Sequence, residues 1–319
     1  MSINFDYFSI SLLLGGFTAL LSGFVVFIHN RRRLENIAWL LSNMTSAIWS
    51  FSYFAMINSP SYNAAVISDW ILHIAAVFVP VFYFLSVLSI TDEYETHKPQ
   101  LLLTTIVGSI FLALIPTQIF IIDVIPKAHF NFVPDAGPAY IYFALYFFLV
   151  VTYTLYFVFK KLSRTVDPIQ KAKLKYIIIF TLFGFGGGGS VFLLTFNIPI
   201  LPYPLILFSL YPAVSGYAIF RYQLFNVKVI TTELSVFIIW IFLLIRTLLS
   251  RSLNDAIING SLLLLLNVAG VFLIRSVIRE VRQREEIQKL ADDLKLANQG
   301  QSSLMHFMNH QVKGRLGNV

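Results

Sequence analysis

Cysteine is absent from this sequence, and charged residues are scarce. Without cysteine the chain forms neither disulfide bonds nor thiolate metal sites. Only 12% of its 319 residues are charged, against about 25% in soluble domains, whereas 57% are hydrophobic and the mean hydropathy is +0.75. These values exclude a soluble globular class and predict a multi-pass membrane protein.

The excess of positive charge is the next feature, because a net charge of +7 would suit a nucleic-acid-binding protein. The basic residues instead lie in loops beside apolar segments. Four alternate loops hold 12 of the 23 Lys and Arg residues, and the N-terminus and the intervening loops hold 3. We therefore expect no nucleic-acid partner, an N-terminus outside the cell and a cytoplasmic C-terminal helix. We also expect no cleavable signal peptide.

Long apolar runs predict nine membrane spans, since a helix needs about 20 residues to cross a bilayer. The predicted spans are 8–28, 36–57, 66–90, 101–121, 140–159, 176–196, 203–220, 234–249 and 261–278. Residues 122–138 contain three prolines and are expected to form a loop outside the hydrocarbon. The predicted fold is an all-α membrane protein: a seven-helix transmembrane bundle, a two-helix transmembrane hairpin and then a cytoplasmic coiled-coil helix.

The coiled coil is predicted from a heptad pattern after the last span. Apolar residues recur at alternating steps of three and four, with Gln301 and Gln311 on the same stripe. The apolar members are Ile287, Leu290, Leu294, Ala297, Leu304 and Met308. This pattern is typical of a parallel helical dimer, and it places His310 beside the core, facing outward. A neutral imidazole in that position can act as a nucleophile towards a phosphoryl group. Upstream, Val277 and Val281 are out of phase with the heptads, which predicts a local two-state element.

The segment around His310 resembles the H-box of bacterial sensor histidine kinases, whose usual form is F-x-x-H-E-[LIV]-[RK]-[TN]-P-L. The matching residues are Phe307, His310, Val312, Lys313 and Leu316. Gln311 replaces the acidic residue that assists proton removal in that family, Gly314 replaces Thr or Asn, and Arg315 replaces Pro. The resemblance implies that His310 is the phosphoacceptor, with Gln311 and Lys313 beside it in the catalytic motif.

A second resemblance covers residues 8–228. The seven predicted spans and the segment 216–227, with the sequence GYAIFRYQLFNV, are similar to the seven-helix sensor region found at the N-terminus of some bacterial histidine kinases. That family has a similar segment after its seventh span. Trp39 and Trp49 also fit its aromatic-rich second helix.

Together the two resemblances imply the membrane sensor portion of a two-component histidine kinase in the bacterial plasma membrane. The implied regions are a sensor (1–230), a transmembrane hairpin (231–278), a signalling coiled coil (279–303) and the start of the dimerisation and phosphoacceptor helix (304–319). The implied partners are the membrane, a second copy of the chain, a response regulator and an unknown small-molecule or membrane stimulus. No ATP-binding domain is recognisable, so we expect a truncated kinase that holds no cofactor itself; ATP and Mg²⁺ are expected only on the missing catalytic domain.

Asp69 and His73 are the candidate sensing residues, because ionisable groups within spans are costly and often functional. They lie four residues apart near the outer end of the third span, where they could bind a polar ligand or respond to protons. The simpler interpretation is that Asp69 caps the span while His73 bonds to a neighbouring helix. The glycines at 184 and 186–189 lie inside an apolar span, which favours close helix packing or a hinge over a phosphate site.

Four other interpretations remain open. His310 can be an ordinary solvated residue, and the chain a non-enzymatic receptor or scaffold that signals through its coiled coil. His306 and His310 share a helix face and could bind a metal ion, although no third ligand is near, and no metal site is predicted. A transporter is disfavoured because the sequence has no internal repeat.

Overall fold

The computed structural model describes residues 6–211 without a gap and, beyond them, residues 215, 239, 243, 247, 255, 257–272, 276, 279, 283, 287 and 290. The chain divides into two units, Met1–Val229 and Ile230–Val319, and each is described by itself. The described residues are mostly helical and include one two-stranded sheet.

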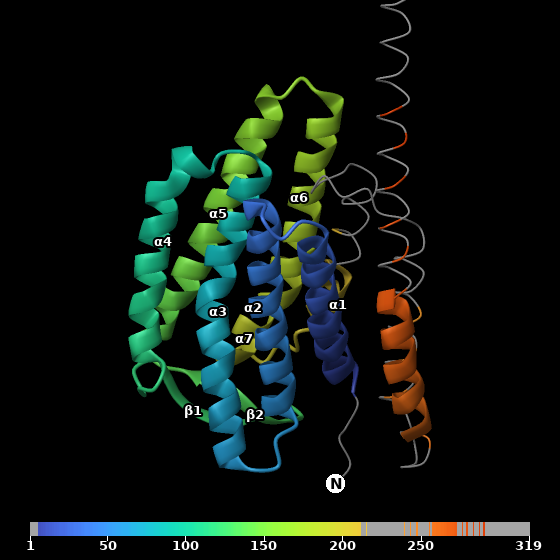
Figure 1. Ribbon diagram of the computed structural model, residues 1–319. Coiled ribbons are helices and arrows are strands. Elements are labelled where there is room, and N and C mark those ends of the chain that lie inside the picture. Colours follow the sequence, from blue (N-terminus) through green and yellow to red (C-terminus); the bar gives the residue numbers. More distant parts are fainter. Residues whose placement is uncertain are drawn as a thin grey trace, which may run out of the picture. The chain divides into compact units, whose positions relative to one another are not determined.

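Six long helices lie side by side in the described part of the first unit (Figure 1). They are α1 (Tyr7–His29), α2 (Leu34–Ile57), α3 (Tyr62–Ile90), α4 (Tyr94–Leu114), α5 (Tyr140–Arg164) and α6 (Pro168–Gly188). α2 contacts α1 and α3, α3 also contacts α4 and α5, and α5 contacts α6. Helices α1, α2, α3 and α5 cover the four spans predicted for them and extend slightly beyond.

The outer faces of the bundle are apolar, as a bilayer requires. Five segments, comprising α1, α3, α4, α5 and residues 168–195, are long and apolar enough to cross a membrane. Several of their large hydrophobic side chains are more than half exposed, namely Leu102, Leu103, Ile106, Ile110, Leu145 and Leu149. Since soluble monomers rarely expose such continuous apolar surface, these faces fit contact with lipid.

Helix α2 is the exception, because polar residues interrupt its apolar sequence. At 24 residues it is still about 36 Å long, which is enough to cross the hydrocarbon. Its polar residues Asn36, Asn43 and Ser50 are at most 1% exposed, inside the bundle. Polar groups inside a membrane bundle usually bond to neighbouring helices. Ser50 follows this rule and donates to the Leu12 carbonyl oxygen on α1 at 2.7 Å.

The fourth predicted span and the loop after it require correction. Helix α4 ends at Leu114, not near residue 121, because Pro116 has no backbone N–H with which to continue the hydrogen bonding of the helix. The chain then forms a β-hairpin of β1 (Ile121–Lys127) and β2 (Phe130–Ala136). A loop was predicted for 122–138, so the prediction of an all-α fold missed this sheet.

The predicted sixth span also differs from the structure. Helix α6 begins eight residues early, since Asp167 accepts backbone hydrogen bonds as its N-cap and Pro168 suits the first turn. It ends at Gly188, and the short helix α7 (Val191–Thr195) follows after Gly189 and Ser190. Helical residues resume at 205–211; the rest of the predicted seventh span lies outside the described residues except for residue 215.

In the second unit the described residues include an apolar helix, Ile257–Phe272. It overlaps the predicted ninth span. The predicted eighth span and the heptads are described only at isolated positions, and Val277 and Val281 lie outside the described residues. The coiled coil therefore stays a prediction.

Candidate functional site

A cavity of about 70 Å³ lies inside the first unit. Its walls come from α2, α3, α5, α6, α7 and residues 205–211, with Pro134 of the hairpin at one end. Half of the described residues that line it are aromatic. The α2 residues in the lining are Trp39, Ser42, Ser46, Trp49 and Tyr53, which follow steps of three and four and so share one helix face.

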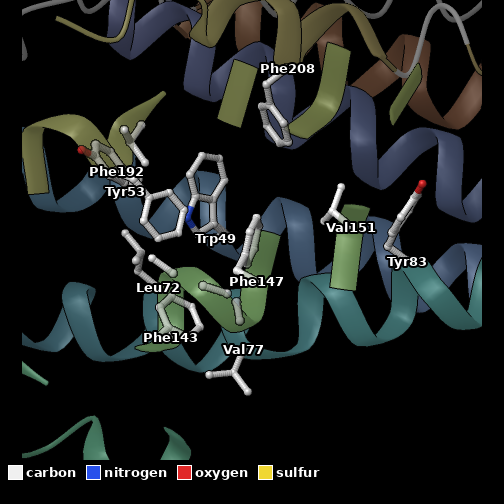
Figure 2. Close-up of a cluster of buried hydrophobic side chains, with 14 of the residues drawn as sticks. Trp49, Tyr53, Leu72, Val77, Tyr83, Phe143, Phe147, Val151, Phe192 and Phe208 are labelled. Carbon is white, nitrogen blue, oxygen red and sulfur yellow. The ribbon is translucent and has the colours of Figure 1, made fainter. Parts of the chain in front are cut away.

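Aromatic contacts fix the walls of the cavity. The Trp49 ring lies 5.8 Å from the Tyr53 ring and 5.2 Å from the Phe208 ring, measured between centroids (Figure 2). The Phe185 ring of α6 lies 4.7 Å from the Tyr83 ring and 5.6 Å from the Phe147 ring. Edge-to-face and tilted contacts of this kind join α2, α3, α5, α6 and the 205–211 segment around the cavity.

Asp69 and His73 are brought together and buried, with exposed fractions of 2% and 0%. His73 Nδ1 lies 3.0 Å from the Asp69 carbonyl oxygen and 3.1 Å from Asp69 Oδ1. On its other side, His73 Nε2 lies 3.4 Å from the Tyr140 hydroxyl of α5. His73 lines the cavity and Asp69 lies behind it.

The interpretation of Asp69 as a helix cap is wrong. Helix α3 begins seven residues earlier, at Tyr62, and its N-cap is Ser61, whose hydroxyl accepts from the Ala64 backbone N–H. The hydrogen-bonding contact of His73 with a neighbouring helix is present, on α5. Whether Asp69 and His73 sense a stimulus remains a proposal.

Tyr53 is the residue that the sequence analysis missed. Its side chain lines the cavity and is 2% exposed, and its hydroxyl has no hydrogen-bond partner among the described residues. Tyr53 and His73 both line the cavity, and His73 lies within hydrogen-bonding distance of both Asp69 and Tyr140. The spacing of Trp39, Trp49 and Tyr53 on one face of α2 is the sequence signal that could have identified it.

Two buried hydrogen bonds hold the helices around the cavity. The Tyr83 hydroxyl of α3 and Thr181 Oγ1 of α6 lie 2.7 Å apart. The Tyr211 hydroxyl donates to Asn43 Oδ1 of α2, also at 2.7 Å. Because Tyr211 lies at the end of the 205–211 segment, this bond joins α2 to that segment.

The hairpin closes the end of the bundle at which α1, α3 and α5 begin (Figure 1). It is fastened to α1 through His129 and Asp6, whose Nε2 and Oδ2 lie 3.0 Å apart, and to α3 through the Tyr62 hydroxyl, 2.7 Å from Asp123 Oδ1. Asn131 donates to the Ser59 carbonyl oxygen between α2 and α3. No single element therefore holds the hairpin in place.

The strongest fastening is at Lys127, whose side chain is only 8% exposed. Its ammonium donates to Asp135 Oδ1 at 3.0 Å, to the Pro134 carbonyl at 2.9 Å, and to the carbonyls of Leu194 and Thr195 in α7, both at 3.2 Å. Burial alone would raise the pKa of Asp135, but hydrogen bonds from Asn197 and Lys127 and the charge of Lys127 lower it below its usual value. Pro134 and Thr195 also line the cavity, so this network closes it.

The predicted phosphoacceptor motif, with His310, Gln311 and Lys313, lies outside the described residues, as does the candidate pair His306 and His310. Within the described residues, no cluster of three His, Asp or Glu side chains could hold a metal ion.

A family model described as the N-terminal 7TM region of histidine kinase matches residues 11–228, which is more than half of the chain. The matched segment begins in α1 and runs to within one residue of the end of the first unit. Comparison with curated proteins and with solved structures gave no significant match.

Proposed function

We infer the function from a premise that the match establishes: the chain belongs to the family defined by the N-terminal 7TM region of histidine kinase. It is a multi-pass membrane protein that carries the sensor region of a histidine kinase. We propose that a stimulus at this region is relayed to autophosphorylation of His310 and then to a response regulator. The match over residues 11–228 is the observation that carries the proposal.

The proposed relay has three parts. The first unit receives the stimulus, and the cavity with Tyr53, Asp69 and His73 is the candidate place. The change passes through the segment after Tyr211 and the predicted hairpin 231–278 into the predicted coiled coil, which pairs two copies of the chain. A neutral ring nitrogen of His310 then attacks the γ-phosphorus of ATP bound to a catalytic domain, and ADP leaves. The proposed orientation has the N-terminus and the β-hairpin outside the membrane and the basic loops inside.

The second candidate is a receptor or scaffold that signals without phosphorylation. The departures of Gln311 and Arg315 from the H-box favour it. Gln311 cannot act as a base for the histidine proton, although its amide can still form hydrogen bonds.

Phosphorylation of His310 separates the two candidates. The full-length gene product in membrane vesicles is incubated with ATP labelled on its γ-phosphate. We expect an acid-labile, alkali-stable label that His310→Gln reduces to background, because only a histidine ring nitrogen forms such a bond within this motif. His306→Gln is the matched control, four residues away, and should keep the label. Absence of label, or label that persists in His310→Gln, would overturn the kinase proposal in favour of the receptor.

A further inference from the structure

We propose that the cavity is a binding site for a small neutral molecule that has an apolar body and one oxygen, a hydroxyl or a carbonyl, which accepts a hydrogen bond from Tyr53. That the molecule acts as the stimulus rests on the proposed sensor function. That it binds rests only on the geometry of the cavity.

The walls of the cavity select an uncharged, apolar body. None of the described residues that line it is Lys, Arg, Asp or Glu, so an ion placed there would lose its hydration without gaining a direct counter-charge from them. The nearest carboxylate, that of Asp69, faces His73 and does not line the cavity. The aromatic rings of Trp49, Phe147 and Phe208 instead offer apolar contact, since rings of this kind pack favourably against small hydrophobic groups.

Tyr53 supplies the polar end of the site. A buried hydroxyl without a partner costs free energy, and buried polar groups are nearly always hydrogen-bonded. The other buried tyrosine hydroxyls at the cavity are already engaged: Tyr83 with Thr181, Tyr211 with Asn43, and Tyr140 with His73. Tyr53 is therefore the donor that an occupant can satisfy, and a hydroxyl or carbonyl oxygen is the simplest acceptor.

The volume limits the size of the occupant. About 10 to 15 Å³ of free space of this kind holds one water molecule, so a cavity of about 70 Å³ holds a small molecule of several non-hydrogen atoms. Ordered water is the competing occupant. A buried water needs two to four polar partners, however, and half of the described lining residues are aromatic. An occupant with an apolar body suits these walls better than water does.

The position of the site offers a route to the rest of the chain. Trp49 contacts both Tyr53 and Phe208, so an occupant beside Tyr53 also touches the ring that packs on the 205–211 segment (Figure 2). Phe208 and Tyr211 belong to that segment, and their rings lie 5.4 Å apart. Binding would thus bias the segment through direct contacts.

Tryptophan fluorescence tests the proposal with the chain purified in lipid nanodiscs. Trp70→Phe combined with Trp240→Phe leaves Trp39 and Trp49, both of which line the cavity. The probe is 2-bromoethanol, whose bromine quenches an indole that it touches. We expect saturable quenching, and we expect Tyr53→Phe to raise the half-saturation concentration about tenfold. Tyr146→Phe is the matched control: it removes a buried tyrosine hydroxyl of α5 that donates to the Val77 and Thr104 carbonyl oxygens and is not among the lining residues, so the half-saturation concentration should not change.

Two analogues of similar size complete the test. Bromoethane lacks the oxygen, and its quenching should not depend on Tyr53; 2-bromoethylammonium is charged and should not saturate. Linear quenching by 2-bromoethanol would show that the cavity does not bind it, and saturable quenching equal in the parent and in Tyr53→Phe would show that Tyr53 is not the donor; either result would overturn the proposal. Saturation by the ammonium analogue would overturn the requirement for a neutral molecule.

The labelling of His310 in the full-length gene product, measured with and without 2-bromoethanol, keeps this inference distinct from the proposed function. Saturable binding with unchanged labelling would sustain the site and reject its role as the stimulus. Binding without any labelling of His310 would sustain the site while the kinase proposal fails.

Discussion

Substitution of Gly187 by alanine is expected to destabilise the bundle by about 3 kcal/mol, towards the upper end of the range for overpacking a core. A Cβ atom at this position would lie 2.5 Å from the Phe208 backbone nitrogen and 2.9 Å from the Pro204 carbonyl oxygen. Both are backbone atoms, so no side-chain rotation relieves the clash, and the 204–208 segment must move away from α6. Thermal unfolding of the purified variant, followed by circular dichroism at 222 nm, should show a clearly lowered midpoint.

Gly186 is the matched control, one residue earlier on the same helix. A Cβ there meets nothing within 4 Å. Gly186→Ala should therefore leave the stability unchanged or raise it by up to about 1 kcal/mol, the advantage of alanine over glycine in a helix. If the two variants unfold alike, close backbone packing at Gly187 does not stabilise the bundle. The 2-bromoethanol titration of Gly187→Ala is a second readout, because Phe208 forms part of the cavity wall.

The glycines at 184 and 186–189 show which part of the helix packing could be predicted from the sequence. Its position inside an apolar segment correctly predicted close helix packing, and it gave no support to a phosphate site. Which glycine makes the contact could not be predicted, because that depends on the 204–208 segment, about 20 residues further along the chain. The end of α6 at Gly188 was also missed. The sequence stays apolar through residue 196, so hydropathy gives no sign of the break between α6 and α7.

The hairpin shows a second limit of sequence-based prediction. Hydropathy treated Ile115–Ile121 as the end of a span, whereas Pro116 ends the helix and the β-branched residues that follow suit a strand. The proline could have predicted the end of the helix, but the prediction followed the hydropathy instead. The contacts that hold the hairpin could not be predicted, since Lys127 bonds to backbone carbonyls of α7 that no sequence pattern specifies.

The candidate site was predicted in part. The spacing of Asp69 and His73 placed them on one face of α3, and the structure shows them buried beside a cavity. Tyr53 was missed because an aromatic residue in an apolar helix carries no signal by itself. Its importance comes from the absence of a partner for its hydroxyl among the described residues, which depends on how α2, α3 and α5 pack.

Substitution of Lys127 by methionine is the second large effect that we expect, a loss of stability of about 3 kcal/mol. Methionine fills a similar volume but donates no hydrogen bond. The Asp135 carboxylate and three backbone carbonyl oxygens therefore lose the ammonium group that they share. Breaking a buried ion pair by removing one partner costs about 3 to 5 kcal/mol. The lower end applies here because Asp135 is partly exposed and keeps its hydrogen bond from Asn197. Thermal unfolding measures the loss, and Lys171→Met, which removes an exposed charge on α6, should have little effect.

The dependence on pH distinguishes the loss of this network from a simple packing defect. The pKa of Asp135 is lower in the folded chain than its ordinary value of 3.8, so its carboxylate stabilises the fold above that pH and the contribution disappears as the pH falls through the folded value. In Lys127→Met the pKa of Asp135 should rise, because two of the causes that lower it are removed. The difference in stability between parent and variant should therefore be full at pH 6 and shrink below pH 4. A difference that stays constant down to pH 3 would show that Asp135 is not the partner that matters.

Because Pro134 and Thr195 line the cavity beside this network, the Lys127→Met variant should also bind 2-bromoethanol more weakly. Weaker binding would connect the position of the hairpin to occupancy of the site.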